Sequence, residues 1–299
     1  MTQAVGRSLA IGIAASIFAV CTGTGWQVLI RAGVTSGLTP FDIALFRYGI
    51  PALLVLPILW RNGLLPEGSN PWLAGVLVAG SGLPFGLMVM SGATFAPVAH
   101  MGAIMPSSTP LMVAVMSVLL LGERLSRLRI LGFLVVVAGI MMVVRQAFDV
   151  TWPGAWRGDL LFLGAAILWA LSTIALRKLG LTPWHMVAVV SFWSGLGAIA
   201  LWFANGAHDF SAVPRTALLL QLVWQGILAG FLAMYAYGLA VRHLGPTNAT
   251  LWGAIMPGTV AFAGYVTLGE PVAMLTMAGI ALTSLGMILA SGALDRKAP

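Results

Sequence analysis

The sequence has few charged residues and a single cysteine. Only 8% of its 299 residues are charged, whereas roughly a quarter of the residues in a soluble domain are charged. Hydrophobic residues make up 60% of the chain, and the mean hydropathy is +0.99. This composition excludes an ordinary soluble fold. The lone cysteine, Cys21, excludes an internal disulfide and a cysteine-based metal cluster.

Sequence signatures of common enzymes are also missing. The four histidines show no metal-ligand spacing. There is no G-x-S-x-G nucleophile elbow, no P-loop and no dinucleotide fingerprint. We therefore predict no catalytic residue, no metal site and no cofactor, although a membrane-bound enzyme and a channel stay open as rival classes.

Apolar runs of about 18 to 24 residues recur from end to end, and about 20 helical residues cross a bilayer core. The pattern predicts an all-α integral membrane protein with ten transmembrane helices. The first run is too long for a signal-peptide core and has no small-residue cleavage site after it, so we expect it to be retained. The predicted spans are residues 8–30, 41–60, 72–95, 97–121, 128–145, 158–176, 184–203, 217–240, 246–268 and 273–292.

The net charge of +7 reflects topology and not a nucleic-acid partner. Basic residues in cytoplasmic loops outnumber those outside. We therefore predict a multi-pass protein of the bacterial inner membrane with both termini in the cytoplasm. Ten basic residues fall on the predicted cytoplasmic side, four on the other side and Arg47 within a span: the ten are Arg7, Arg61, Arg124, Arg127, Arg129, Arg177, Lys178, Arg242, Arg296 and Lys297, and the four are Arg31, Arg145, Arg157 and Arg215.

Four short patterns occur twice in the same order, at separations of 143, 151 and 147 residues. These separations differ by four residues at a time, about one helical turn, so each helix face stays in phase. We therefore predict two five-helix halves, residues 1–149 and 150–299. Because five is odd, the second half enters the membrane from the opposite side, as in many transporters. The repeated patterns are 37–41 with 180–184, 102–106 with 253–257, 121–123 with 268–270, and Gly132 and Gly139 with Gly279 and Gly286.

The loops after the repeated Leu-Gly-Glu provide a check on this inversion. Three arginines follow within residues 124–129, whereas residues 271–276 contain none. Equivalent loops on opposite sides of a membrane are expected to differ in this way.

These motifs carry a family resemblance. The chain resembles the drug/metabolite transporter superfamily, specifically the EamA-type ten-helix exporters, and within it is most similar to the aromatic amino-acid exporters of the YddG type. The resemblance implies that spans five and ten are peripheral and that the others surround a central cavity open alternately to either side. It is carried by residues 121–126 and 268–271, Pro106, Pro257, Arg47 and residues 158–161.

Two prolines occupy the same place in the repeated pentapeptide. Pro106 and Pro257 are predicted near the middle of equivalent helices, where each would bend its helix. Two crossing bent helices would open a cavity at the membrane midplane. The alternative is that membrane helices simply tolerate proline.

Polar and aromatic side chains share faces of several predicted helices at spacings of three, four and seven residues. Such stripes could line a cavity for an amphipathic solute, or they could serve helix packing. Arg47, about 10 Å deep in its span, either binds a substrate carboxylate, makes a structural contact or reaches back to the interface. The candidate substrate-binding residues are Trp26, Arg47, His100, Ser107, Trp169, Ser172, Gln225, Asn248 and Trp252.

The eight carboxylates are all predicted at span ends or in loops. Proton relays usually place acidic residues within the membrane. The sequence therefore favours facilitated transport over tight proton coupling, with His100 as a group that could still titrate.

We predict that the protein exports amino acids, aromatic and other apolar ones with broad specificity, by alternating access through a central cavity. Its expected partners are a small-molecule substrate and the lipid bilayer. The alternative within carriers is an exporter of lipophilic drugs, nucleosides or other metabolites.

Overall fold

A computed structural model describes residues 2–65, 70–146, 148, 152–207, 209–244 and 251–293. Within these ranges the chain is helical and contains no strand, as its hydropathy predicts. Seven described helical stretches, two of them made of consecutive shorter elements, are long and apolar enough to cross a membrane: 8–35, 71–95, 98–121, 127–146, 155–179, 184–204 and 215–244. Two shorter apolar helices, at 252–268 and 274–290, follow them.

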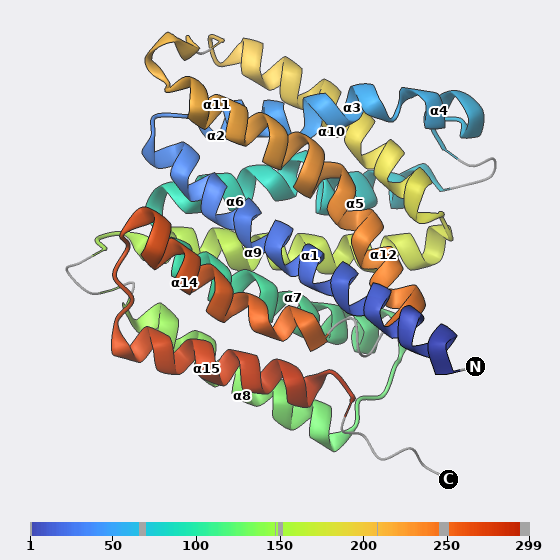
Figure 1. Ribbon diagram of the computed structural model, residues 1–299, viewed down its shortest axis with the longest axis vertical. Coiled ribbons are helices and arrows are strands. Elements are labelled where there is room, and N and C mark those ends of the chain that lie inside the picture. Colours follow the sequence, from blue (N-terminus) through green and yellow to red (C-terminus); the bar gives the residue numbers. More distant parts are fainter. Residues whose placement is uncertain are drawn as a thin grey trace.

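The helical elements come in chain order (Figure 1). The first half forms α1 (Thr2–Thr35), α2 (Pro40–Ala44), η1 (Leu45–Gly49), α3 (Ile50–Leu54), α4 (Leu56–Asn62), α5 (Pro71–Ser81), α6 (Leu83–Phe95), α7 (Val98–Leu121) and α8 (Arg127–Gln146). The second half forms α9 (Ala155–Leu179), α10 (Pro183–Ala204), η2 (Phe210–Ala212), α11 (Arg215–Gln221), η3 (Leu222–Leu232), α12 (Ala233–Leu244), η4 (Trp252–Ile255), α14 (Met256–Leu268) and α15 (Met274–Ala290). Elements η1 and η3 are π-helical, and η2 and η4 are 3-10 turns.

The repeated Gly-Leu-Thr-Pro pattern proves to be a helix boundary. Gly37 and Gly180 adopt positive φ angles of 97° and 61°, which favour glycine and end the preceding helix. The threonine two residues later, Thr39 or Thr182, caps the next helix by accepting a hydrogen bond from a backbone N–H of its first turn. Proline then occupies the first helical position, where its missing N–H has no consequence.

Two predicted spans are interrupted instead of continuous. The span predicted at 41–60 changes from α2 to η1 and then to α3 and α4. Pro51 lacks the N–H that would bond the Arg47 carbonyl four residues earlier. Pro57, six residues further along, likewise lacks the N–H that would bond the Leu53 carbonyl. The span predicted at 72–95 breaks at Gly82, between α5 and α6. Proline, which hydropathy alone does not penalise, accounts for the first interruption.

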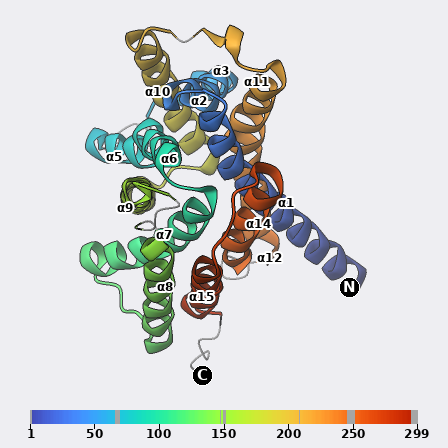
Figure 2. The same ribbon diagram turned by 90° about the vertical axis from the view of Figure 1, so that its left-hand side faces the viewer.

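Equivalent helices of the two halves pack against each other in opposite directions. A Cβ on Gly132 would lie 2.4 Å from the Ala290 amide nitrogen, and one on Gly139 would lie 2.7 Å from the Gly279 carbonyl oxygen. Helices α8 and α15 therefore run antiparallel in close backbone contact, at one edge of the molecule (Figures 1 and 2). Helices α7 and α14 cross antiparallel in the same way, Gly102 meeting Val260.

The paired prolines do not play the same role in the two halves. Pro106 lies inside the continuous helix α7, as predicted. Pro257 instead lies in the first turn of α14, directly after the 3-10 turn η4. The two prolines therefore differ in their surroundings: the first lies within a continuous α-helix, whereas at the second the helix changes from 3-10 to α.

Helix α1 begins and α15 ends at the same end of the molecule (Figure 1). We expect this end to be cytoplasmic because ten basic residues are predicted there. In a Cys21→Ala background, an impermeant thiol reagent should label Pro153→Cys in intact cells and Leu64→Cys only after permeabilisation. Both positions are exposed. The reverse labelling pattern would overturn the predicted orientation.

Candidate functional site

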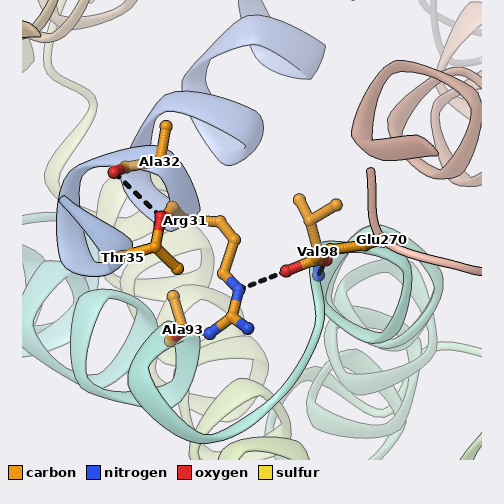
Figure 3. A network of polar contacts seen from close by, with 6 residues as sticks. All are labelled: Arg31, Ala32, Thr35, Ala93, Val98 and Glu270. Carbon is orange, nitrogen blue, oxygen red and sulfur yellow. Dashed lines mark hydrogen bonds and ion pairs between the residues drawn. The ribbon is translucent and has the colours of Figure 1, made fainter. Parts of the chain in front are cut away.

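A buried ion-pair network lies near the C-terminal end of α1, at what we call the Arg31 end of the molecule (Figure 3). The Arg31 Nε donates to Glu270 Oε1 at 2.5 Å, and the Nη1 of the same guanidinium donates to the Ala93 carbonyl at 2.6 Å. Glu270 Oε2 accepts a hydrogen bond from the Val98 amide at 2.7 Å. Both charged side chains are less than 10% exposed. The network joins α1, α6 and α7 to the loop after α14.

Local structure explains why the two charges tolerate burial. Val98 is the first residue of α7, so its amide is one of the donors that have no partner within the helix. A carboxylate is stabilised at such a helix N-terminus. The Arg31 guanidinium also lies 5.3 Å from the Trp152 ring centroid. The sequence placed both residues in loops near the interface and missed that they pair.

His100 and Asp159 form a second buried pair at the same end. His100 Nδ1 lies 2.9 Å from Asp159 Oδ1, and the two side chains are 1% and 5% exposed. Helix α9 begins at Ala155, three residues before the predicted span, so Asp159 falls in its second turn. Asp159 therefore lies near a helix start, as predicted, but its side chain is buried and paired, which the sequence did not indicate.

An aromatic cluster lies between α1, α6 and α9. The Trp26 and Phe85 rings are stacked with centroids 6.3 Å apart, and Phe85 meets Trp169 at 5.1 Å. The Arg47 guanidinium, from η1, lies 4.7 Å from the Trp26 ring centroid. Cation–π contacts of this length are attractive, especially away from water. Arg47 thus points to the aromatic cluster and does not reach back to the interface.

Several buried polar atoms at and near this cluster lack hydrogen-bond partners among the described residues. They include Arg47 Nε and Nη1, Trp26 Nε1, and both amide atoms of Gln27 and Gln225. Gln225 lies in η3, which packs against η1, the element that carries Arg47. The five-residue segment η1 is of the single-turn π kind that frequently marks functional sites inside α-helices.

Other candidates make contacts that helix packing explains. The Ser172 hydroxyl accepts from Ser81 at 2.7 Å and donates to the Trp169 carbonyl at 2.8 Å. The Ser107 hydroxyl contacts Met287 Sδ at 3.4 Å. Trp252 is half-buried in η4, which packs against α1. Asn248 lies outside the described residues.

Comparison with known proteins decides the family. The EamA-like transporter family matches residues 9–145 and again residues 156–292. The chain belongs to the EamA-like transporter family. It is 25% identical over 285 residues to the uncharacterized transporter YdfC of Bacillus subtilis, covering 93% of this chain and 87% of that protein. It is therefore a membrane transporter of the EamA family.

Two further similarities are more limited. A chloroplastic WAT1-related protein of Arabidopsis thaliana is 27% identical over 267 residues, which cover 84% of this chain and 62% of the plant protein. A solved crystal structure superposes with a TM-score of 0.62 at 18% identity, covering 95% of this chain and 97% of the other. The second likeness shows the fold alone.

The sequence missed three residues that the structure adds to the site of this EamA-like transporter. Phe85 joins the two predicted tryptophans, and its place on α6 gave no polar signal. Gln27 follows Trp26 directly, and one turn further along the same helix lies Arg31. For Gln27 the available signal was a polar residue within an apolar run, since buried polar groups in membranes are costly, whereas Arg31 follows the end of the predicted span and gave no such signal.

Proposed function

We propose that this EamA-like transporter exports amino acids, aromatic and other apolar ones, by alternating access. The observation that carries the proposal is the arrangement of Arg47 beside Trp26 and Phe85. An arginine guanidinium binds carboxylates with two parallel hydrogen bonds. Aromatic rings next to it can hold an apolar or aromatic side chain. An amino acid presents both groups within a few ångströms of each other.

The unpaired polar atoms support a ligand at this place. A buried donor or acceptor without a partner costs about 1–3 kcal/mol, and more for a charged group. Arg47 and Trp26 offer donors, and the Gln225 amide offers both a donor and an acceptor. A zwitterion could satisfy both kinds, its carboxylate accepting from Arg47 and its ammonium donating to an amide oxygen.

The positions of the described acidic residues argue against a cationic drug as substrate. Their carboxylates are bound elsewhere: Asp42 to Trp202, Glu270 to Arg31, Asp159 to His100, Glu123 to Arg177 and Asp209 to Ser211. A permanent cation at the aromatic cluster would face the Arg47 charge without a counter-charge. An apolar amino acid carries its own.

Two equivalent ion pairs support alternating access. Gly122 and Gly269 end α7 and α14 with φ angles of 69° and 67°, so the next residue, Glu123 or Glu270, takes an equivalent place. The first pairs with Arg177 near the end of α9, and the second with Arg31 near the end of α1. Helices α1 and α9 each begin one half, as expected for a ten-helix inverted repeat.

The two pairs differ in burial. The Arg177–Glu123 pair is 3.2 Å long and its side chains are about half exposed, whereas the Arg31–Glu270 pair is almost fully buried. The Arg31 end is therefore held by a buried ion pair, and the opposite end by a half-exposed one. In the proposed alternating access, burying the Arg177–Glu123 pair and exposing the Arg31–Glu270 pair would close the opposite end and open the Arg31 end.

Flux through purified protein in liposomes tests the proposed function. The panel contains phenylalanine, tryptophan, leucine and alanine, a nucleoside and a cationic lipophilic drug. We expect saturable counterflow of the amino acids, strongest for aromatic and large apolar ones. Flux of the nucleoside or the drug without any amino acid would contradict the proposal, and non-saturating flux would indicate a pore.

Removing a tryptophan of the cluster should weaken aromatic substrates selectively. We expect Trp26→Ala to lower phenylalanine transport about tenfold, equivalent to about 1.4 kcal/mol of lost contact, and alanine transport much less. Trp169→Ala should act in the same direction. Trp60→Ala is the matched control because this side chain is 93% exposed. Equal losses for phenylalanine and alanine would show that the tryptophans serve packing only.

A further inference from the structure

A groove runs between α1 and α12, which pack side by side (Figure 1). Its volume is about 380 Å³, and it is lined by apolar and aromatic side chains of residues 11–18 and 232–239. Ala15 and Ala236 are buried and form its floor, whereas Ile11, Phe18 and Tyr235 are exposed and form its rim. The proposed amino-acid site uses none of these residues.

The groove faces the hydrocarbon region of the membrane. Both of its walls belong to stretches that are long and apolar enough to span a bilayer, 8–35 and 215–244. An occupant of the groove is therefore apolar along most of its length. The volume lies at the lower end of the range for small-ligand pockets, about 300–1,000 Å³. A single hydrocarbon chain suits a groove of this size.

One end of the groove is closed by polar and backbone contacts. The Ser8 hydroxyl lies 2.9 Å from His243 Nδ1, across the gap between the two helices. A Cβ on Gly12 would lie 2.6 Å from Leu244 Cγ and 3.0 Å from His243 Cβ, so α1 and α12 touch here. An occupant therefore cannot extend further between the two helices.

Arg242 places a positive charge beside this closed end. Tyr235, Leu239 and Arg242 follow one another at spacings of four and three residues, so they lie on one stripe of α12. The Arg242 side chain is exposed, and no described residue forms an ion pair or hydrogen bond with it. Neither α1, η3 nor α12 contains an acidic residue. Within the described part of the chain, nothing compensates this charge.

Aromatic rings mark the level of the membrane interface at this end. Trp184, in the first turn of α10, stacks on Tyr235 with ring centroids 5.7 Å apart, and both side chains are exposed. Tryptophan and tyrosine gather where the hydrocarbon meets the lipid headgroups. Arg242 lies seven residues further toward the end of α12, about 10 Å along a helix. It therefore lies on the headgroup side of the two rings.

We propose that this groove binds one anionic phospholipid, with an acyl chain along the apolar walls and the phosphate at Arg242. The occupant is a lipid because the groove faces the bilayer and the polar groups beside it, Ser8 and Arg242, lie at one end. The lipid is anionic because the ammonium of a zwitterionic headgroup would meet Arg242 without a carboxylate to accept it. Basic residues at the ends of membrane helices attract anionic headgroups.

Such a lipid joins the two halves of the chain. Helix α1 opens the first half and α12 belongs to the second, and the lipid contacts both. A ligand that binds only the folded protein stabilises it in proportion to its occupancy. Binding of the lipid needs no transported substrate, so it can be measured independently of the proposed function.

Native mass spectrometry of the purified protein in detergent measures the binding. The probes are dioleoyl-phosphatidylglycerol, which is anionic, and dioleoyl-phosphatidylcholine, which is zwitterionic. We expect one phosphatidylglycerol per chain to bind about fivefold more tightly than phosphatidylcholine, which is the effect of one arginine near a membrane surface. It should also raise the thermal unfolding temperature more. Equal binding of the two lipids would overturn the proposal.

Arg242→Gln tests the contact with the headgroup. This variant should bind phosphatidylglycerol no better than phosphatidylcholine, whose own binding should change little. Arg242→Lys keeps the charge and should keep most of the preference. Arg124→Gln is the matched control, because Arg124 is an exposed arginine after α7 that does not line the groove. Equal losses in Arg242→Gln and Arg124→Gln would show an unspecific attraction to positive charge and would contradict the site.

Ala14→Phe tests the contact with the acyl chain. Ala14 lines the groove and is exposed, so a larger ring fills the groove without entering the packed contact between α1 and α12. It should weaken the binding of both lipids severalfold, since apolar contact with the chain is lost. Ile17→Phe changes an exposed residue of the same helix outside the groove and should have no effect. Undiminished lipid binding in Ala14→Phe would exclude the groove as the site.

A photoactivatable phosphatidylglycerol locates the lipid without any substitution. With the reactive group in the acyl chain, labelled residues should concentrate at 11–18 of α1 and 232–239 of η3 and α12. Labelling spread evenly over the membrane-facing helices would overturn the site, as would a dimer of the protein that Ala14→Phe disperses. Because no amino acid is present, failure of this experiment leaves the proposed function standing, and a substrate other than an amino acid leaves the lipid site standing.

Discussion

Replacing Arg47 by glutamine is expected to lower the transport of phenylalanine by about 10- to 100-fold. A hydrogen bond to a charged group contributes about 1.5–3 kcal/mol, and Arg47 has two buried nitrogens without a partner among the described residues. Glutamine keeps polarity and some length but loses the charge. Initial rates of counterflow at matched protein levels measure the effect.

Two controls separate carboxylate binding from a packing role of Arg47. Arg47→Lys keeps the charge but loses the planar fork, so it should restore only part of the activity. Arg145→Gln changes an exposed arginine and should leave transport unchanged. Phenylalaninamide lacks the carboxylate, so any residual transport of it should not depend on Arg47. If Arg47→Gln reduces both compounds equally, the arginine acts through the contact with Trp26 alone.

The helical membrane fold could be predicted from the sequence because its causes are local. A hydrophobic run of bilayer length gives a span, and glycine followed by threonine and proline gives a helix boundary at 37–40 and again at 180–183. The interruptions of the predicted spans could not be predicted in this way. The π segments η1 and η3 depend on how backbone carbonyls find donors next to prolines and close-packed glycines, which hydropathy does not register.

The candidate site was predictable only in part. Trp26 and Trp169 were predicted from the polar and aromatic stripes of their helices and Arg47 from its depth in a span, and the structure brings them together beside Phe85. Ser107 and Ser172 were chosen in the same way, and their hydroxyls have packing partners instead. The position of a residue along a helix can be predicted from the sequence. The direction in which a side chain points relative to another helix cannot.

The acidic residues show why position along the chain misleads. Glu270 follows the end of α14 and looks like a loop residue, yet its side chain is turned inward to Arg31 and the first amide of α7. Asp159 stands near a helix start and is buried against His100. Both depend on contacts between residues more than 50 positions apart. Packing between helices that are distant in the chain creates these contacts, and neither hydropathy nor local spacing registers it.

Breaking the Arg31–Glu270 pair should destabilise the protein far more than breaking its equivalent. Removing one partner of a buried pair costs about 3–5 kcal/mol because it leaves the other charge uncompensated. We therefore expect Glu270→Gln to lower the thermal unfolding temperature clearly. Glu123→Gln removes a half-exposed partner of Arg177, where such pairs contribute at most about 1 kcal/mol. Unfolding of the purified variants in one detergent measures both.

The same comparison has a conformational readout. In a Cys21→Ala background, Ala93→Cys should be unreactive to an impermeant thiol reagent, because Ala93 is 0% exposed and its carbonyl binds Arg31. Glu270→Gln should make it reactive from outside, since the lost pair favours the form that is open at the Arg31 end. Glu123→Gln should not. Arg31→Met with Glu270→Met removes both charges together and should regain stability while the cysteine stays reactive. A destabilised Glu270→Gln with Ala93→Cys still protected would show that the pair holds the fold but does not close the path.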